Sequence, residues 1–227
     1  MKSIIFYNLY PKNHWKELTL FLLSNVPHDD IVINVALDRW DRLFKKKSIT
    51  KFLQPIPKVK AIYFTENSKM GEVPGFENMR KQIDLSGYNI LTYLHSKGVT
   101  KPNNPNISDW VKLMHYFLIE RFDLCKEAFA NGCILYGVNL SEEQLSNSYN
   151  YGPSKFSNFH YSGNFVSMNL SMVRDKFIKT PIDPDYFGLE GFFGKLCDYR
   201  YAYNAHLSSN NIRNHYIEHY PEKFYRS

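Results

Sequence analysis

The sequence predicts an α/β fold built on an open sheet. Apolar runs of strand length alternate along the chain with longer stretches whose apolar residues recur at helical spacing. Polar residues stand where strand-like runs end, for example after residues 31–37 and 90–94. Ligands of open α/β sheets bind beyond the carboxyl ends of the strands. The fold class therefore predicts where a functional site lies.

Length and composition favour one folded domain that spans residues 1–227. Hydrophobic residues make up 44% of the chain, enough for a sizeable core. The net charge of +6 favours an anionic partner such as a nucleotide diphosphate, nucleic acid or an acidic membrane face, without choosing among them. Three cysteines without Cys-x-x-Cys spacing argue against a zinc site and fit a reducing compartment. No apolar run reaches membrane-spanning length, so we expect a soluble, cytoplasmic protein without a transmembrane segment.

The N-terminal half is predicted to contain three strand–helix units. Three consecutive lysines, Lys45 to Lys47, lie in the second predicted helix. They could bind phosphate, but a charge run on a helix is more often a solvated face, and we prefer that interpretation. Strands are expected at residues 3–7, 31–37 and 58–64, and helices at residues 14–24, 42–52 and 76–85.

Residues 89–110 form the segment around which the chain is organised. An apolar run at residues 90–94 has the length of a buried strand and delivers His95, Lys97 and Gly98 at its carboxyl end. A polar loop then leads into a helix, an order that is typical of a ligand-binding crossover. The alternative is that Lys97 and Gly98 make a turn and that His95 is a surface histidine.

The C-terminal half begins with the longest helical pattern. Ser108-Asp109 predicts a cap for a helix over residues 110–130. A strand at residues 134–138 leads into a polar stretch, residues 139–158, for which we expect a lid or an acceptor-binding loop. The pattern then predicts a strand at residues 165–170, a helix from residue 171 and a helical segment at residues 186–196. Between them Asp183-Pro-Asp185 predicts a turn, with a metal site as the alternative because the pair fits an Asp-x-Asp string.

Several short motifs stand in order along most of the chain. They are Ile4-Ile-Phe-Tyr-Asn-Leu-Tyr10 with Trp15-Lys-Glu, Tyr93-Leu-His-Ser-Lys-Gly-Val-Thr100, Asn106-Ile-Ser-Asp-Trp110 with Met114 and Tyr116-Phe-Leu-Ile-Glu120, Tyr136-Gly-Val-Asn139, His160-Tyr-Ser-Gly-Asn-Phe165, and Glu190. The ordered set resembles a family of small nucleotide-sugar glycosyltransferases of large DNA viruses and bacteria, typified by the chlorella-virus capsid-glycan glycosyltransferases. Two departures concern the acceptor side: Val111 stands where family members tend to have Arg, and Val166-Ser-Met168 where they have bulky aromatics.

The resemblance implies a GT-A-type fold, in which a Rossmann-like, mixed and mostly parallel sheet is flanked by helices on both faces. It also implies a nucleotide-diphosphate sugar donor, with uridine as the expected base (UDP). The implied acceptor is a glycan or glycoprotein hydroxyl, as in the synthesis of a viral or surface glycan, and no nucleic acid is expected. Hexosyl and deoxyhexosyl transfer, with retention or inversion, stay open.

Glycosyl transfer builds negative charge on the departing diphosphate, so the site needs a cation there. GT-A enzymes commonly use an Asp-x-Asp metal motif at the end of the fourth strand, where this chain has His95-Ser-Lys97. The sequence therefore requires no metal or other cofactor, although manganese or magnesium stays an alternative. We expect Lys97, with His95, to face the diphosphate, and Arg80 or Lys81 to add charge from the preceding helix.

The donor is expected to lie across the carboxyl ends of three strands, because an α/β sheet presents ligands there. The end of the first strand would contribute two residues to the donor site. The end of the second strand and the turn after residues 90–94 would contribute the others. The residues expected to contact the donor are Tyr7, Asn8, Asp38 and the turn from His95 to Gly98.

Glu190, Asp109 and Asn164 are expected to converge on the sugar and the acceptor hydroxyl. Glu190 lies in an aromatic, glycine-rich stretch and would serve as general base in an inverting enzyme, or position the acceptor in a retaining one. Asp109 would contact sugar hydroxyls, or merely cap its helix. Asn164 follows a glycine that permits close backbone approach, and its alternative is a turn asparagine. The same motif supplies the residues expected to face the acceptor, which are His160, Ser162 and Gly163.

Two other functions fit parts of the sequence. A non-catalytic relative could bind a glycan or a partner through the same crevice, which the departures at Val166-Ser-Met168 make conceivable. A methyltransferase is a further possibility for a small Rossmann-like chain, but no Gly-x-Gly turn follows the first strand.

Overall fold

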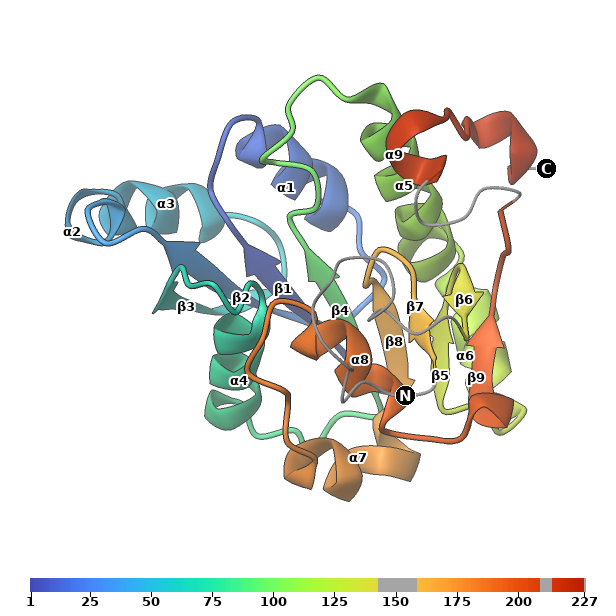
Figure 1. The fold of residues 1–227 in the computed structure, drawn as a ribbon. Helices are drawn as coiled ribbons and strands as arrows, with labels where there is room; N and C mark the ends of the chain where they lie inside the picture. Colours follow the sequence, from blue (N-terminus) through green and yellow to red (C-terminus); the bar gives the residue numbers. More distant parts are fainter. Residues whose placement is uncertain (143–158, 209–213, 227) are drawn as a thin grey trace.

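A computed structural model describes residues 1–142, 159–208 and 214–226. Its centre is a seven-stranded sheet whose strands are, in spatial order, β3 (Val59–Glu66), β2 (Asp30–Leu37), β1 (Ser3–Leu9), β4 (Ile90–His95), β8 (Val166–Asn169), β5 (Leu135–Gly137) and β9 (Ala202–Asn204) (Figure 1). β8 runs antiparallel to β4 and β5, and the other neighbouring strands are parallel. The predicted fold class, a mixed but mostly parallel α/β sheet of Rossmann type, is confirmed.

Helices cover both faces of this sheet (Figure 1). One face carries α1 (Trp15–Leu23), α3 (Lys46–Leu53), α5 (Pro105–His115) and α6 (Phe122–Ala130), and the other carries α4 (Val73–Gln82), α7 (Leu170–Lys179) and α8 (Gly188–Gly194). The shorter elements are α2 (Asp41–Phe44), a π-helical turn at Tyr116–Glu120, β6 (Leu140–Ser141), β7 (His160–Tyr161), α9 (Asn214–Ile217), and 3-10 turns at Tyr199–Tyr201 and Glu222–Phe224.

Alternate residues of β1 enter two hydrophobic cores on opposite faces of the sheet. Ile5 and Tyr7 belong to the core under α1 and α5, whereas Ile4 and Phe6 belong to the core under α4, α7 and α8. All seven residues of β1 are buried, as a central strand covered on both faces requires. The strands therefore form a rigid platform for the polar residues at their ends.

The chain changes direction across the sheet between β3 and β4. It builds β2 and β3 on one side of β1 and then places β4 on the other side. In this register Asn8 of β1 lies between Asn34 of β2 and His95 of β4. Such a switch point opens a crevice at the carboxyl ends of the strands.

The predicted start of the helix near residue 110 is wrong. α5 begins at Pro105, and the Asn104 side chain caps it by accepting hydrogen bonds from the backbone N–H groups of Asn106 (3.0 Å) and Ile107 (3.4 Å). Proline fits the first turn of a helix because it has no N–H to leave unpaired there. The Asn-Pro pair therefore fixes the helix start ahead of Ser108-Asp109.

The predicted continuous helix over residues 110–130 is interrupted by the π-helical turn. The backbone N–H of Arg121 donates to the carbonyl of Tyr116 at 2.8 Å, five residues back, and Arg121 leaves helical geometry with φ −102° and ψ 42°. The wider turn holds one extra residue, so α6 starts anew at Phe122. Apolar spacing on both sides remains helical, which conceals the break in the sequence.

The Asp183-Pro-Asp185 stretch forms the predicted turn. Asp183 accepts a hydrogen bond from Lys195 Nζ at 2.6 Å, and Asp185 accepts one from the backbone N–H of Phe187 at 2.9 Å. The helices in the described part of the chain are all too short or too polar to cross a bilayer. Residues 143–158, most of the expected lid or acceptor loop, lie outside the described residues.

Candidate functional site

A cleft of about 440 Å³ opens at the carboxyl ends of β1 to β4. Strand ends form its floor, the loop that follows β4 forms one wall, and the α8 region forms another. It thus lies at the switch point of the sheet, where the fold class predicts a site. Its lining includes Asn8, Tyr10, Asn67, Lys69, Glu72, residues 95–101, Asn164, Tyr186, Glu190 and Tyr216.

An ion pair stands in the wall of this cleft. Glu72, which immediately precedes α4, contacts Nδ1 of His95. The other ring nitrogen of His95 lies 3.0 Å from the carbonyl oxygen of Gly163. Both partners have hydrogen-bond acceptor oxygens, so the two contacts fix the orientation of the imidazole ring.

Further hydrogen bonds immobilise the Glu72 carboxylate. The hydroxyl of Tyr93 donates to Oε2 at 2.8 Å, and Nδ2 of Asn164 donates to the same oxygen at 2.9 Å. Burial opposes the charged form, but the interaction with His95 and the hydrogen bonds outweigh it, so the pKa of Glu72 is lowered. Glu72 therefore ties α4, β4 and the turn before β8 together as a fixed anion.

Glu190 is a second carboxyl of the cleft with a contrasting environment. It lies on α8 and is partly exposed to the cleft. Burial, helped by the charge of Glu72, raises the pKa of Glu190 to about 7, against the opposing influence of Lys97 and His95. A carboxyl with this pKa can accept a proton at neutral pH, whereas Glu72 is held ionised.

The loop after β4 brings cations to the cleft. Lys97 Nζ lies 4.0 Å from the ring centroid of Trp110, and Lys101 Nζ lies 4.5 Å from that of Tyr216. Gly98 has φ +87°, and a Cβ there would come within 2.6 Å of Ile107, so the loop requires glycine. Among the residues described, no group of three or more His, Cys, Asp or Glu side chains could hold a metal ion.

A chain of amides fixes the cleft floor. Asn8 accepts a hydrogen bond from Asn34 Nδ2 at 3.2 Å and donates to the backbone carbonyl of Glu72 at 3.4 Å. Asn34 also donates to Thr65 at 2.8 Å and accepts from Asn78 at 3.1 Å. The ends of three strands and the helix α4 are thereby joined through side chains.

Asp38 lies at the rim of the cleft, directly after β2. It accepts hydrogen bonds from Lys12 Nζ (2.8 Å), Asn67 Nδ2 (2.9 Å) and the hydroxyl of Tyr10 (3.1 Å). These contacts lower the pKa of Asp38, and the hydrogen bond from Lys12 has the largest effect. Tyr10 and Asn67 line the cleft, so Asp38 borders it through them.

Two residues predicted to contact the donor lie away from the cleft. Tyr7 is fully buried, and its hydroxyl is 3.0 Å from Thr19 on α1, because this residue of β1 faces the helix. Arg80 donates to the backbone carbonyls of Phe177 and Thr180, both at 2.8 Å, and so joins α4 to the end of α7. These contacts correct the predicted donor roles of Tyr7 and Arg80.

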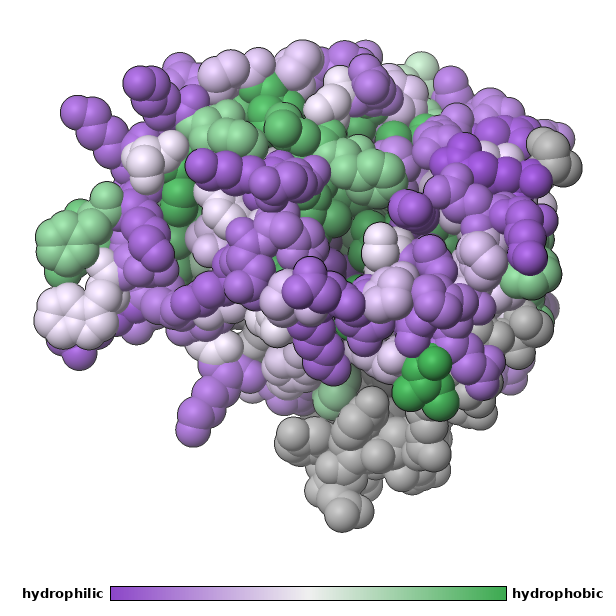
Figure 2. Space-filling view, turned by 90° about the horizontal axis from the view of Figure 1, so that it is seen from above, coloured by the Kyte–Doolittle hydropathy of each residue, from purple (hydrophilic) through white to green (hydrophobic). Residues whose placement is uncertain are grey.

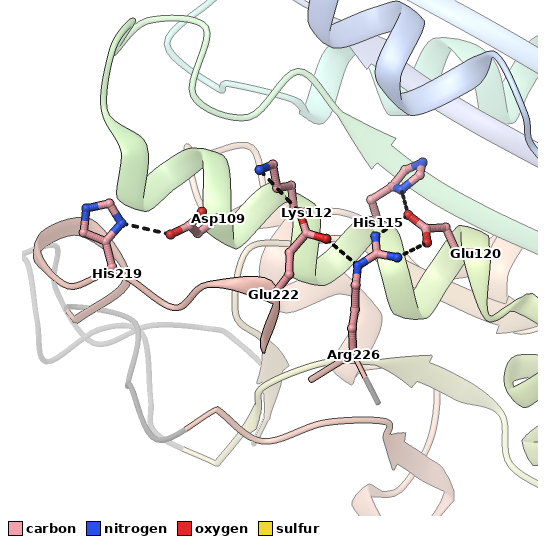
Figure 3. A network of polar contacts seen from close by, with 7 residues as sticks. All are labelled: Asp109, Lys112, His115, Glu120, His219, Glu222 and Arg226. Carbon is pink, nitrogen blue, oxygen red and sulfur yellow. Dashed lines mark hydrogen bonds and ion pairs between the residues drawn. The ribbon is translucent and has the colours of Figure 1, made fainter. Parts of the chain in front are cut away.

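Asp109 is also placed outside the cleft. Its carboxylate accepts a hydrogen bond from Nδ1 of His219 at 2.9 Å and so connects α5 to the C-terminal segment (Figure 3). It neither caps α5 nor lines the cleft with Glu190. The predicted convergence of Asp109 with Glu190 is therefore corrected.

The motif expected to face the acceptor lies mostly beneath the cleft. His160 and Ser162 are buried, and Gly163 presents its carbonyl to His95. Gly163 has φ +90°, and a Cβ there would meet Met114 Sδ at 2.5 Å. Asn164, also in the left-handed region with φ +60°, is the member of this motif that lines the cleft.

Several cleft residues were not predicted from the sequence. Glu72 offered one local signal, because it immediately precedes a Val-Pro helix start after the third strand. Tyr216 lies in a weakly patterned C-terminal segment that gave no signal. Other lining residues that were not predicted include Tyr10, Asn67, Lys69, Lys101 and Tyr186.

No family model matches this chain. A search of curated proteins likewise returned no match. Among solved structures, the chain is similar to "4-diphosphocytidyl-2C-methyl-D-erythritolsynthase from Anaerococcus prevotii DSM 20548", with 12% sequence identity and a TM-score of 0.42 over 92% of this chain and 91% of that one. A similarity of this degree assigns neither a family nor an activity.

Proposed function

We propose that the protein is a glycosyltransferase that moves a sugar from a UDP-sugar donor to a glycan hydroxyl. One observation carries this proposal: motifs far apart in the sequence meet in a single cleft at the switch point of the sheet. Asn8, residues 95–100, Asn164 and Glu190 all line it. These are some of the positions through which the sequence resembles nucleotide-sugar glycosyltransferases, and a viral or surface glycan is the expected acceptor class.

The chemistry of the cleft suits this transfer. Lys97 and His95 would face the diphosphate, and the Lys97 cation would stabilise the charge that develops on it. The acceptor oxygen forms a bond to the anomeric carbon while the bond from that carbon to the diphosphate oxygen breaks, and the leaving diphosphate keeps the electron pair. Glu190 takes the acceptor proton, a role that its pKa of about 7 suits.

Ligand-induced thermal stabilisation tests the donor assignment. UDP and UDP-sugars should raise the melting temperature more than ADP or GDP, each with and without manganese, because a ligand that binds only the folded state stabilises it. Stabilisation by adenine or guanine nucleotides alone would contradict the uridine assignment.

Nucleotide release tests catalysis. A UDP-sugar that binds should yield free UDP once a glycan acceptor is added, and Glu190→Gln should bind the donor but release UDP much more slowly. Binding without release across a broad acceptor panel would favour the non-catalytic alternative. The departures that suggested this alternative, Val166 to Met168, are buried in β8 between β4 and β5 and so lie outside the cleft wall.

A further inference from the structure

Helix α2 and the residue that caps it, Trp40, expose three large apolar side chains that are close together in the sequence. The exposed fractions of Trp40, Leu43 and Phe44 are 74%, 68% and 78%. Among the other large apolar residues described, only Met1, Leu207 and Ile217 reach 68%. Their spacing, i, i+3 and i+4, places them on one side of a helical turn. Side chains of this size are normally turned inward, so a cluster of them indicates a contact surface.

Basic residues surround this apolar cluster. Between Arg39 and Gln54 the chain has six basic residues and one acid, a net charge of +5, whereas the whole chain has +6. Lys45 pairs with Asp41 at 2.9 Å, whereas Lys46, Lys47 and Lys51 are exposed and border an open hollow along α3. Most of the protein's excess positive charge is therefore concentrated beside Trp40, Leu43 and Phe44.

The cluster lies on a projecting part of the molecule. α2 is at the left extremity of the ribbon in Figure 1, beyond the edge strand β3. Seen from above, apolar and hydrophilic side chains stand out together at this same edge (Figure 2). A convex tip of this kind can enter a soft surface without a complementary pocket.

We propose that the α2–α3 tip docks the protein on an anionic lipid bilayer, with Trp40, Leu43 and Phe44 among the headgroups and Lys46, Lys47 and Lys51 against lipid phosphates. Tryptophan, leucine and phenylalanine beside lysines are the composition of helices that lie in a membrane interface. Nucleic acid would use the lysines but leave Leu43 and Phe44 in water. This proposal is independent of the transferase activity, since vesicle binding is measured without turnover.

The α2–α3 tip directly follows the rim of the cleft in the chain. Asp38, at the cleft rim, is followed directly by Arg39 and Trp40. A bilayer held by the tip would therefore lie beside the cleft opening, within reach of a membrane-borne acceptor.

Co-sedimentation with vesicles tests the proposal. The full-length protein should pellet with vesicles of phosphatidylcholine and phosphatidylglycerol, and much less with vesicles of phosphatidylcholine alone. Salt at 0.5 M should release it, because the screening length is then about 4 Å. Trp40→Ala/Leu43→Ala/Phe44→Ala should abolish pelleting. In the triple variant Lys46→Gln/Lys47→Gln/Lys51→Gln, the loss of each lysine should weaken vesicle binding about fivefold.

The control variant is Met172→Ala/Ile178→Ala, which removes two exposed apolar side chains, 52% and 51% exposed, from α7 at another face. It should pellet like the parent protein. All variants change surface residues, so matching circular dichroism would show that they fold. Equal pelleting of the parent and both tip variants would overturn the proposal. The proposal would also be overturned if no form of the protein bound vesicles and sedimentation velocity showed a parent dimer that the tip variants do not form.

Discussion

Glu190 shows how one cleft gives two glutamates opposite properties. Glu72 is ionised because His95, Tyr93 and Asn164 all donate to it, whereas burial leaves Glu190 with a raised pKa. Only the second can exchange a proton near neutrality. The proposed general base is thus the glutamate that is not committed to an ion pair with His95.

The transfer rate should follow the ionisation of Glu190. A base must be deprotonated to act, so the rate should rise as the pH increases through about 7. Glu190→Gln should lower the turnover number about 100-fold or more and remove this rise. Steady-state UDP release from pH 5.5 to 8.5 provides the measurement. An unchanged profile in the variant would exclude Glu190 as the base.

The same carboxyl should make stability depend on pH. Its pKa is about 7 in the folded protein and about 4.5 when exposed, so the folded state binds more protons in this window and loses stability as pH rises from about 4.5 to 7. The melting temperature of Glu190→Gln relative to the parent should therefore increase between pH 5 and 8. A constant difference would contradict the raised pKa, whatever the activity.

Lys97 should act on the leaving group and on Glu190 together. Lys97→Ala should reduce turnover more than it weakens donor binding, because the cation meets the greatest charge in the transition state. It should also move the pH profile upward, since Lys97 lowers the pKa of Glu190. Lys97→Arg, which keeps the charge, should retain the profile. Parent-like turnover and profile in Lys97→Ala would refute both roles.

At the scale of elements, helix α4 lies unusually close to the strands that carry the amide chain. A Cβ on Gly75 would lie 2.1 Å from Asn8 Oδ1 and 2.5 Å from Asn34 Nδ2. Helical glycine is otherwise unfavourable, so its presence indicates a packing requirement. Gly75 lets α4 place Glu72 at the cleft.

Gly75→Ala should destabilise the protein by about 1–3 kcal/mol, because α4 must move away from Asn8. Donor affinity should fall as well, since the shift displaces Glu72 and the Asn8 amide. Gly87→Ala is the matched control, because a Cβ there meets nothing within 4 Å. Urea unfolding and UDP-induced thermal shifts measure both effects. Equal stability of the two variants would show that α4 tolerates the methyl group.

At the scale of the whole molecule, ion pairs hold the C-terminal segment against α5 and the π-helical turn (Figure 3). Arg226 makes a bidentate pair with Glu120 at 2.6 and 2.7 Å and also reaches Glu222. This segment supplies Tyr216 to the cleft. The last part of the chain thus contributes to a site whose first residue, Asn8, precedes Tyr216 by 208 positions.

Arg226→Gln should lower stability by about 1 kcal/mol, the upper end for partly exposed pairs, and less at high salt. We expect a loss at the upper end of this range because Arg226 pairs with Glu120 in a bidentate manner and also contacts Glu222. Arg200→Gln is the control, since the strongly exposed Arg200 pairs only locally with Asp198 among the described residues and should change nothing measurable. Denaturation curves at 0.05 and 0.5 M NaCl compare them. Salt-independent loss would point to packing rather than charge.

The sequence by itself determined six strands of the central sheet, β1 to β5 and β8, and their polar carboxyl ends, and hence the edge of the sheet where the cleft lies, whereas β9 was not predicted. Short continuous apolar runs are typical of buried strands in a covered sheet, and the cleft residues Asn8, His95, Lys97 and Glu190 were predicted from local pattern or motif. The start of α5 was not predicted, because Ser108-Asp109 also has the residue types of a cap, whereas in the structure Asn104 caps the helix.

Only the tertiary structure decided which side chains face the cleft and how they titrate. Tyr7 and Asn8 are neighbours in sequence, yet strand alternation buries one against α1 and presents the other to the cleft. Glu72 and Glu190 have the same chemistry, but the pKa of Glu190 is raised by burial, whereas at Glu72 partners more than 20 residues away outweigh burial and lower the pKa. Burial and electrostatic neighbours are properties of the packed chain, so the local sequence does not contain them.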